Sequence, residues 1–211
     1  EPGVGVPLDN RLTNEDGTAY TTTKNPTPLG DKAIGTTGSF SLTVVDATSN
    51  DGPATEDQVT FTSTFTGPND KEYTIKVDRV LHRGPNHTFL GGVGTNFVHH
   101  GRTGIGLKIM PQLFAYVAFW GVAELSIDGE VVASNRFIHA MLTDNVRDER
   151  YNVTFDEGVD PSRLQFHIIM PPLEVTPQGP RPSPVPTGFI LPNGNEQPFL
   201  HINFESVTIE P

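Results

Sequence analysis

The longest apolar-rich stretch runs from Leu113 to Leu142 and predicts two long strands. The strands meet at Asp128-Gly129. An Asp-Gly pair between apolar runs is typical of a two-residue hairpin, because its type I′ turn needs positive φ at both residues. Both faces of this hairpin are apolar in the middle. We therefore expect the hairpin (residues 113–142) to lie centrally and to be covered on both sides.

The turn also predicts the register of the hairpin. If Ile127 pairs with Glu130, regular pairing places Trp120 opposite Phe137. Side chains alternate between the two faces of a strand, and a slip of one residue would exchange the faces. Every inference about His139 therefore depends on this register. With it, one face carries aromatic, histidine and methionine side chains, namely Phe114, Tyr116, Trp120, Phe137, His139 and Met141.

Shorter alternating stretches predict further strands on either side of the hairpin. The first three of them predict an antiparallel meander with one face in water. Asp160-Pro161 predicts one helical turn, because Asp is a good N-cap and Pro fits the first helical position. The stretches are residues 39–45, 58–65, 71–81, 151–155, 164–170 and 199–209.

Two segments lack this alternation. Residues 1–35 are rich in Thr, Asn, Gly and Pro and predict an extended N-terminal arm, with one strand near Ala19–Thr23. Residues 171–198 are dense in proline and predict extended or irregular chain that wraps the body. We therefore expect an all-β fold, a single antiparallel β-sandwich or β-barrel domain over residues 36–211 that includes the proline-rich segment.

Charge and composition exclude several classes of function. The chain has 14 Lys and Arg residues against 25 Asp and Glu residues, and it lacks the basic cluster that nucleic-acid binding requires. No apolar run approaches the ~20 residues that span a bilayer, so no transmembrane segment is expected. The absence of cysteine excludes disulfides and thiolate metal sites. Because the chain starts at Glu1 and not at Met, we expect a processed protein exported to the periplasm or the extracellular space.

Histidine is the sharpest chemical signal, because imidazole binds copper and zinc well. His99 and His100 would point to opposite faces of a regular strand, unless a bulge at Gly101 re-aims one of them. His139 would lie among apolar side chains, where an unpaired polar group costs ~1–3 kcal/mol. We therefore predict a copper or zinc site that uses His99, His100 and His139.

Other interpretations of the same residues stay open. His139 is equally compatible with a core residue satisfied by a backbone carbonyl, and His99-His100 with a solvated turn. No Gly-x-Ser-x-Gly motif is present, so a non-catalytic protein is favoured. A surface or interaction role is one alternative to metal binding. Another is a barrel that binds a small apolar ligand, with a pocket lined by Tyr116, Trp120, Phe137 and Met141.

Overall fold

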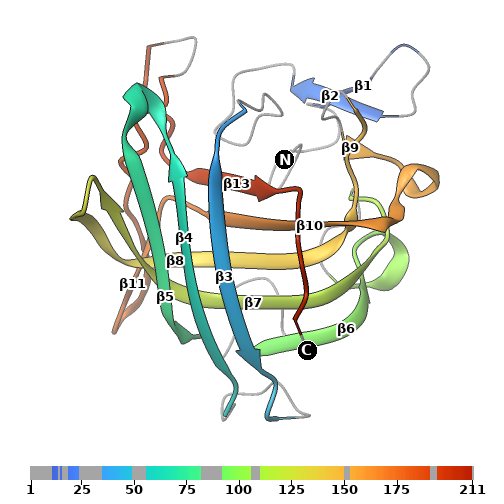
Figure 1. The fold of residues 1–211 in the computed structure, drawn as a ribbon, viewed down its shortest axis with the longest axis horizontal. Coiled ribbons are helices and arrows are strands. Elements are labelled where there is room, and N and C mark those ends of the chain that lie inside the picture. The colour runs from blue at the N-terminus through green and yellow to red at the C-terminus, as the bar shows by residue number, and fades with distance from the viewer. Residues whose placement is uncertain are drawn as a thin grey trace.

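The protein folds as a curled antiparallel sheet that forms a half-barrel, which confirms the predicted all-β class (Figure 1). The computed structural model describes residues 11–13, 15, 19–23, 35–48, 56–81, 92–105, 110–149, 153–190 and 194–210. Short 3₁₀ turns lie at η2 (Pro68–Asp70), η3 (Gly101–Thr103) and η4 (Asp156–Gly158). The strands are β1 (Arg11–Thr13), β2 (Ala19–Thr23), β3 (Gly38–Val45), β4 (Gln58–Thr66), β5 (Glu72–Val80), β6 (Val93–His99), β7 (Leu113–Ile127), β8 (Glu130–Asn145), β9 (Val153–Thr154), β10 (Asp160–Met170), β11 (Leu173–Thr176), β12 (Gly179–Pro182) and β13 (Leu200–Phe204).

The central hairpin β7–β8 has the predicted turn. Asp128 and Gly129 have φ values of 51° and 82°, so both residues take the positive φ of a type I′ turn. Ile127 pairs with Glu130 as expected. The turn type and the first residue pair of the hairpin therefore follow from the local sequence alone.

Further along the hairpin the predicted pairing is wrong by two residues. Trp120 lies opposite His139 and not opposite Phe137. β8 has one extra residue at each of two places. The first lies between Val131 and Ala133, the partners of Ser126 and Leu125, and the second lies between Ala133 and Arg136, the partners of Leu125 and Ala123. Asn135, which has a φ of 53°, lies at the second place. One bulge would have exchanged the faces of the strand, and the second restores them. The face predicted for His139 is therefore confirmed although its partner changed.

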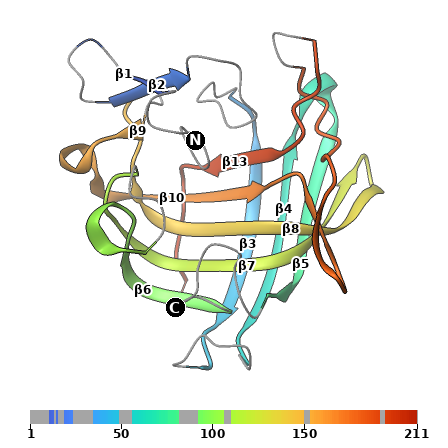
Figure 2. The same ribbon diagram turned by 180° about the vertical axis from the view of Figure 1, so that it is seen from behind.

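The long hairpin belongs to two groups of strands that run in different directions (Figure 2). The first half of β7 pairs with β6, and its second half pairs with β5. Gly121 lies at the change from one partner to the other. A Cβ atom on Gly121 would lie 2.9 Å from the carbonyl oxygen of Arg79 and 3.0 Å from Cγ1 of Val77. The close crossing of β5 over β7 therefore needs glycine at this position.

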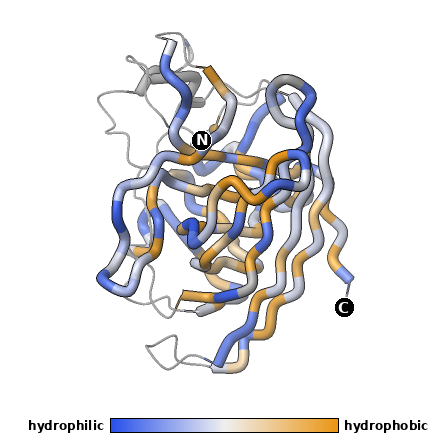
Figure 3. Tube along the Cα trace, turned by 90° about the vertical axis from the view of Figure 1, so that its left-hand side faces the viewer, coloured by the Kyte–Doolittle hydropathy of each residue, from blue (hydrophilic) through white to orange (hydrophobic). Residues whose placement is uncertain are grey.

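Aromatic rings join β3 to β10 and β13, although these strands are not paired with β3 in the described sheet. The ring of Phe40 on β3 lies 4.4 Å from that of Phe166 on β10 and 4.8 Å from that of Phe204 on β13. Apolar and polar positions alternate along the strands in Figure 3. The apolar positions of the alternating stretches lie inward in β3, β4, β5 and β13. They belong to or pack against one large cluster of buried apolar side chains, which we call the main core.

The structure corrects the predicted helical turn at Asp160-Pro161, because β10 already begins at Asp160. The capping chemistry is present. The backbone N–H and the hydroxyl of Ser162 donate to Oδ1 of Asp160 at 2.9 and 2.6 Å. The result is a local turn inside the strand, and the pairing with β8 shifts between Asp160 and Leu164. The alternating apolar positions that follow keep the chain extended.

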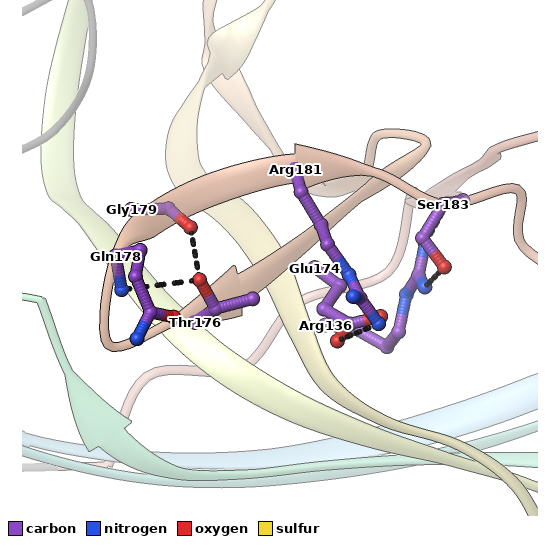
Figure 4. Close-up of polar contacts among 7 residues, drawn as sticks. All are labelled: Arg136, Glu174, Thr176, Gln178, Gly179, Arg181 and Ser183. Atoms are coloured by element: carbon purple, nitrogen blue, oxygen red, sulfur yellow. Dashed lines mark hydrogen bonds and ion pairs between the residues drawn. The ribbon is translucent and has the colours of Figure 1, made fainter.

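The proline-rich segment is also more regular than predicted. β11 and β12 form a hairpin within it, whereas residues 183–189 are irregular as expected. Proline fits β12 because this strand ends the sheet and needs fewer N–H donors. Figure 4 shows how the hairpin is attached: Nη1 of the buried Arg136 donates to Oγ of Ser183 at 2.8 Å, and Nη2 donates to the Ser183 carbonyl. Arg181 and Glu174 form an ion pair at 2.9 Å across the hairpin.

The strand predicted near Ala19–Thr23 is confirmed as β2, which joins β1 and β9 in a small sheet. The other residues of the predicted arm up to residue 34 lie outside the described residues, except Glu15 and β1. The boundary between arm and domain at residue 35 stays a prediction. In the part of the chain that the structure describes, no helix has the length and apolar character needed to cross a membrane.

Candidate functional site

One face of the central sheet carries a histidine-rich surface that points away from the main core. Trp120 pairs with His139, Met141 pairs with His167, and both His139 and His201 pair with Ile169. Cross-strand partners share a face, whereas alternate residues such as Phe166 and Ile168 enter the main core. We call this surface the histidine face, defined by Trp120, Phe137, His139, Met141, Gln165, His167, His201 and Asn203.

The aromatic side chains of the histidine face form a continuous row across β7, β8, β10 and β13. The ring of Trp120 is stacked 3.9 Å from that of His139 and 4.9 Å from that of Phe137. The rings of His139 and His167 are 6.3 Å apart, and those of His167 and His201 are 5.8 Å apart. The sheet therefore gathers imidazoles from three strands that are distant in sequence.

A backbone hydrogen bond sets the tautomer of His139. Its Nδ1 lies 2.9 Å from the carbonyl oxygen of Phe119. A carbonyl oxygen only accepts, so Nδ1 carries the proton and the lone pair of the neutral ring is on Nε2. Histidines that bind metals in proteins commonly hold their second nitrogen in this way. The predicted need of His139 for a polar partner is met by this carbonyl.

His201 is kept neutral. Burial lowers the pKa of its imidazole well below the usual 6.5, and the nearby basic side chains of His167 and Arg147 act in the same direction. A neutral imidazole is the form that binds metals and accepts protons. The histidine face therefore offers an uncharged nitrogen at the β13 edge at pH 7.

Met141 lies within the same surface, directly across the ladder from His167. Only 1% of Met141 and 5% of His167 is exposed to solvent. Met141 also packs against a small apolar cluster that includes Leu113, Ala115 and Ala118. Met141 is thus the cross-strand partner of His167 and lies two residues from His139 on the same face of β8.

The structure places His99 and His100 elsewhere, at the end of β6. Their rings are stacked, with centroids 3.8 Å apart and planes 13° from parallel. His100 has φ 62° and ψ −173°, a conformation that is essentially confined to glycine. The predicted re-aiming of one ring therefore occurs, but at His100 itself and not through a bulge at Gly101. Imidazole lone pairs lie in the ring plane, so nearly parallel rings do not converge on one ion.

The structure does not bring the predicted ligands His99, His100 and His139 together. His99 lies opposite Leu113 and His139 lies opposite Trp120. Those partners are seven residues apart on β7, which corresponds to roughly 23 Å of strand. Within the described ranges, no group of three or more His, Cys, Asp or Glu side chains is arranged to hold a metal ion. His82 and His87 lie outside those ranges.

The residues predicted to line an apolar pocket are brought together in part. Trp120 and Phe137 are stacked, and Met141 lies farther along the same face. Tyr116 instead lies with its ring 4.9 Å from that of Phe114 and its hydroxyl 3.4 Å from Oδ1 of Asp144. Burial, followed by the negative charge of Asp144, raises the pKa of Tyr116. The stacked pair lies outside the main core that fills the half-barrel.

The sequence analysis did not include His167 and His201 among the candidate site residues. The signal was present, because each alternates with core residues and so occupies the second face of its strand. What was missing was the order of the strands. β8, β10 and β13 are neighbours only in the folded sheet, and their pairing follows from packing over long sequence separations.

No family model, no curated protein and no solved structure matches this chain.

Proposed function

We propose that the protein binds copper as Cu(I) through His139, His167 and Met141 of the histidine face. The observation that supports this proposal best is the pairing of Met141 with His167, next to a His139 whose lone pair is fixed on Nε2. Imidazole together with thioether is a soft donor set that suits Cu(I). The predicted histidine site is thereby moved from His99 and His100 to β10.

Several properties of the surroundings favour a soft, singly charged ion. All three donors are almost fully buried, with exposures of 7% for His139, 5% for His167 and 1% for Met141. A dication without a carboxylate ligand would be costly in such an environment. The formal net charge of −11 also attracts cations to the protein as a whole.

The same donors argue against zinc. Structural and catalytic zinc sites use Cys, His, Asp and Glu, and they need three or four such ligands. The described residues provide no such group. A thioether is a ligand type outside that set, and it favours Cu(I). We therefore expect Cu(I) to bind much more tightly than Zn(II).

Titration with metal under anaerobic conditions tests this function. Trp120 is the single tryptophan of the chain and stacks on His139, so its fluorescence reports on the site. We expect one equivalent of Cu(I) to quench the emission and to resist competition by bathocuproine disulfonate at low concentration. Zn(II) should leave the emission unchanged. Absence of Cu(I) binding, or equal responses to both metals, would refute the proposal.

His139→Ala and His99→Ala provide matched variants, because both residues are buried histidines of β-strands. Removing the His139 ligand should weaken Cu(I) binding at least about tenfold, which corresponds to the loss of roughly 1.4 kcal/mol or more. His99→Ala should retain wild-type affinity. The His99 ring stacks on that of His100, at the end of β6 and far from the proposed site. The affinity is measured by chelator competition, which does not depend on Trp120.

A further inference from the structure

Two buried polar atoms of opposite kind flank His167. Within the described part of the chain, Oε1 of Gln165 and Nδ2 of Asn203 have no hydrogen-bond partner. Gln165 is 2% exposed and precedes His167 by two residues on β10. Asn203 pairs with His167 across the ladder to β13. Both side chains therefore belong to the histidine face, one as an acceptor and the other as a donor.

The orientation of the Gln165 amide is set by its neighbours. Nε2 of Gln165 donates to Oγ1 of Thr143 at 3.3 Å. The Thr143 hydroxyl donates its proton to the carbonyl oxygen of Asp144 at 2.8 Å. The Thr143 oxygen therefore accepts only, and a flipped amide would set two acceptors against each other. Oε1 of Gln165 is thus the atom that lacks a donor.

Buried polar atoms in native proteins are nearly always paired, with protein, with water or with a ligand. Side chains at diagonal positions of neighbouring strands, such as Gln165 and Asn203, start about 7–8 Å apart. A small molecule whose donor and acceptor lie on separate atoms spans that separation better than one water, whose donor and acceptor share one oxygen. β13 pairs only with β10 among the described strands, and Asn203 is partly exposed, so the two buried atoms lie near an edge of the sheet.

We infer that Gln165 and Asn203 form a binding site for a small neutral carboxamide. The N–H group of the ligand donates to Oε1 of Gln165, and its carbonyl oxygen accepts from Nδ2 of Asn203. Both unpaired groups are uncharged amide atoms, so they suit an uncharged ligand better than an acid or an amine. This site is independent of copper, because neither amide is one of the proposed metal ligands.

Titration of the copper-free protein with acetamide, followed by two-dimensional NMR of the side-chain amides, tests this site. Acetamide should shift the Gln165 and Asn203 amide resonances in a saturable way in the millimolar range. N,N-dimethylacetamide keeps the carbonyl but has no N–H donor, and it should cause no saturable shift. Use of copper-free protein separates failure of this inference from failure of the copper proposal.

Variants complete the test. Gln165→Leu removes the acceptor and Asn203→Leu removes the donor, and each should weaken acetamide binding about tenfold. Gln178→Leu, in the exposed turn between β11 and β12, is the matched control and should bind normally. If Gln165→Leu fails to fold, Asn203→Leu decides. Three results would overturn the inference: no shift with acetamide, equal shifts with acetamide and N,N-dimethylacetamide, or unchanged binding in the folded variants. The two atoms would then be paired by water.

Discussion

Met141 and His167 lie directly opposite each other on β8 and β10, on the face of the sheet that points away from the main core. Cross-strand partners have Cβ atoms about 4.5–5.5 Å apart. A thioether and an imidazole are therefore neighbours at buried positions. Either residue alone would be ordinary in a protein core. Their combination with His139 is what gives the surface its affinity for a soft metal in our proposal.

His100 should reverse the usual preference for alanine over glycine. His100→Gly and His100→Ala both remove the ring that stacks on His99. Only the alanine variant keeps a Cβ atom at φ 62° and ψ −173°. We expect His100→Gly to be about 1–3 kcal/mol more stable than His100→Ala in denaturant unfolding. An alanine variant of equal or greater stability would show that His100 is not strained.

Asp57 should be essential for holding the first residue of β6 beside the segment that follows β3. One carboxylate oxygen accepts from the backbone N–H groups of Ala47 and Thr48, and the other accepts from Val93 N–H at 2.8 Å. Asp57→Ala leaves these donors without their acceptor and should destabilise the protein by about 3 kcal/mol or more. Asp46, whose carboxylate accepts from Thr95 at an exposed site, is the control. Comparable losses in Asp57→Ala and Asp46→Ala, measured by urea unfolding, would contradict this role.

Stability should fall as the pH decreases below about 6.5, the usual pKa of histidine. The pKa of His201 is lowered in the folded protein, mainly by burial. As the pH falls, the unfolded chain binds a proton at this residue before the folded protein does, so the free energy of unfolding decreases. His201→Gln should show a shallower dependence on pH between pH 7 and pH 5. Identical slopes in both proteins would place the acid sensitivity at other groups.

Gly121→Ala should be destabilising because the added Cβ meets the backbone of β5. The nearest atoms are the Arg79 carbonyl oxygen at 2.9 Å and Cγ1 of Val77 at 3.0 Å. We expect a loss of about 1–3 kcal/mol, as is typical when a packed site is overfilled. Gly35→Ala is a suitable control, since no atom lies within 4 Å of an added Cβ there. Thermal unfolding that does not distinguish the two variants would contradict the close crossing.

The local parts of the fold could be predicted from the sequence. Asp128-Gly129 predicted its turn because the turn depends on two residues only. The face of His139 was predicted correctly for a less direct reason, since two bulges in β8 cancelled each other. β6 was missed because its apolar positions do not alternate: three small or polar residues, Gly94 to Asn96, separate Val93 from Phe97. The helical turn at Asp160 was wrong because local capping bonds also form within a strand.

The candidate site could be predicted only in part, because it is assembled from strands far apart in the chain. His139 was predicted as a metal ligand, whereas Met141 was predicted only to line an apolar pocket. His167 was not predicted as a site residue, since its pairing with Met141 depends on the order of β8 and β10 in the sheet. His99 and His100 were expected to contribute, but the backbone of His100 turns its ring onto His99. A non-glycine residue in that conformation has no sequence signal.

The affinity of Met141→Leu for Cu(I), compared with that of Met110→Leu, tests the proposed copper site most directly. Both methionines are buried, and Leu nearly conserves their volume, so each variant should fold. Met110 packs with Val153, away from the histidine face. We predict that Met141→Leu weakens Cu(I) binding at least about tenfold in chelator competition, while Met110→Leu binds like the wild type. Equal affinities in the two variants would contradict a site in which the Met141 thioether is a ligand.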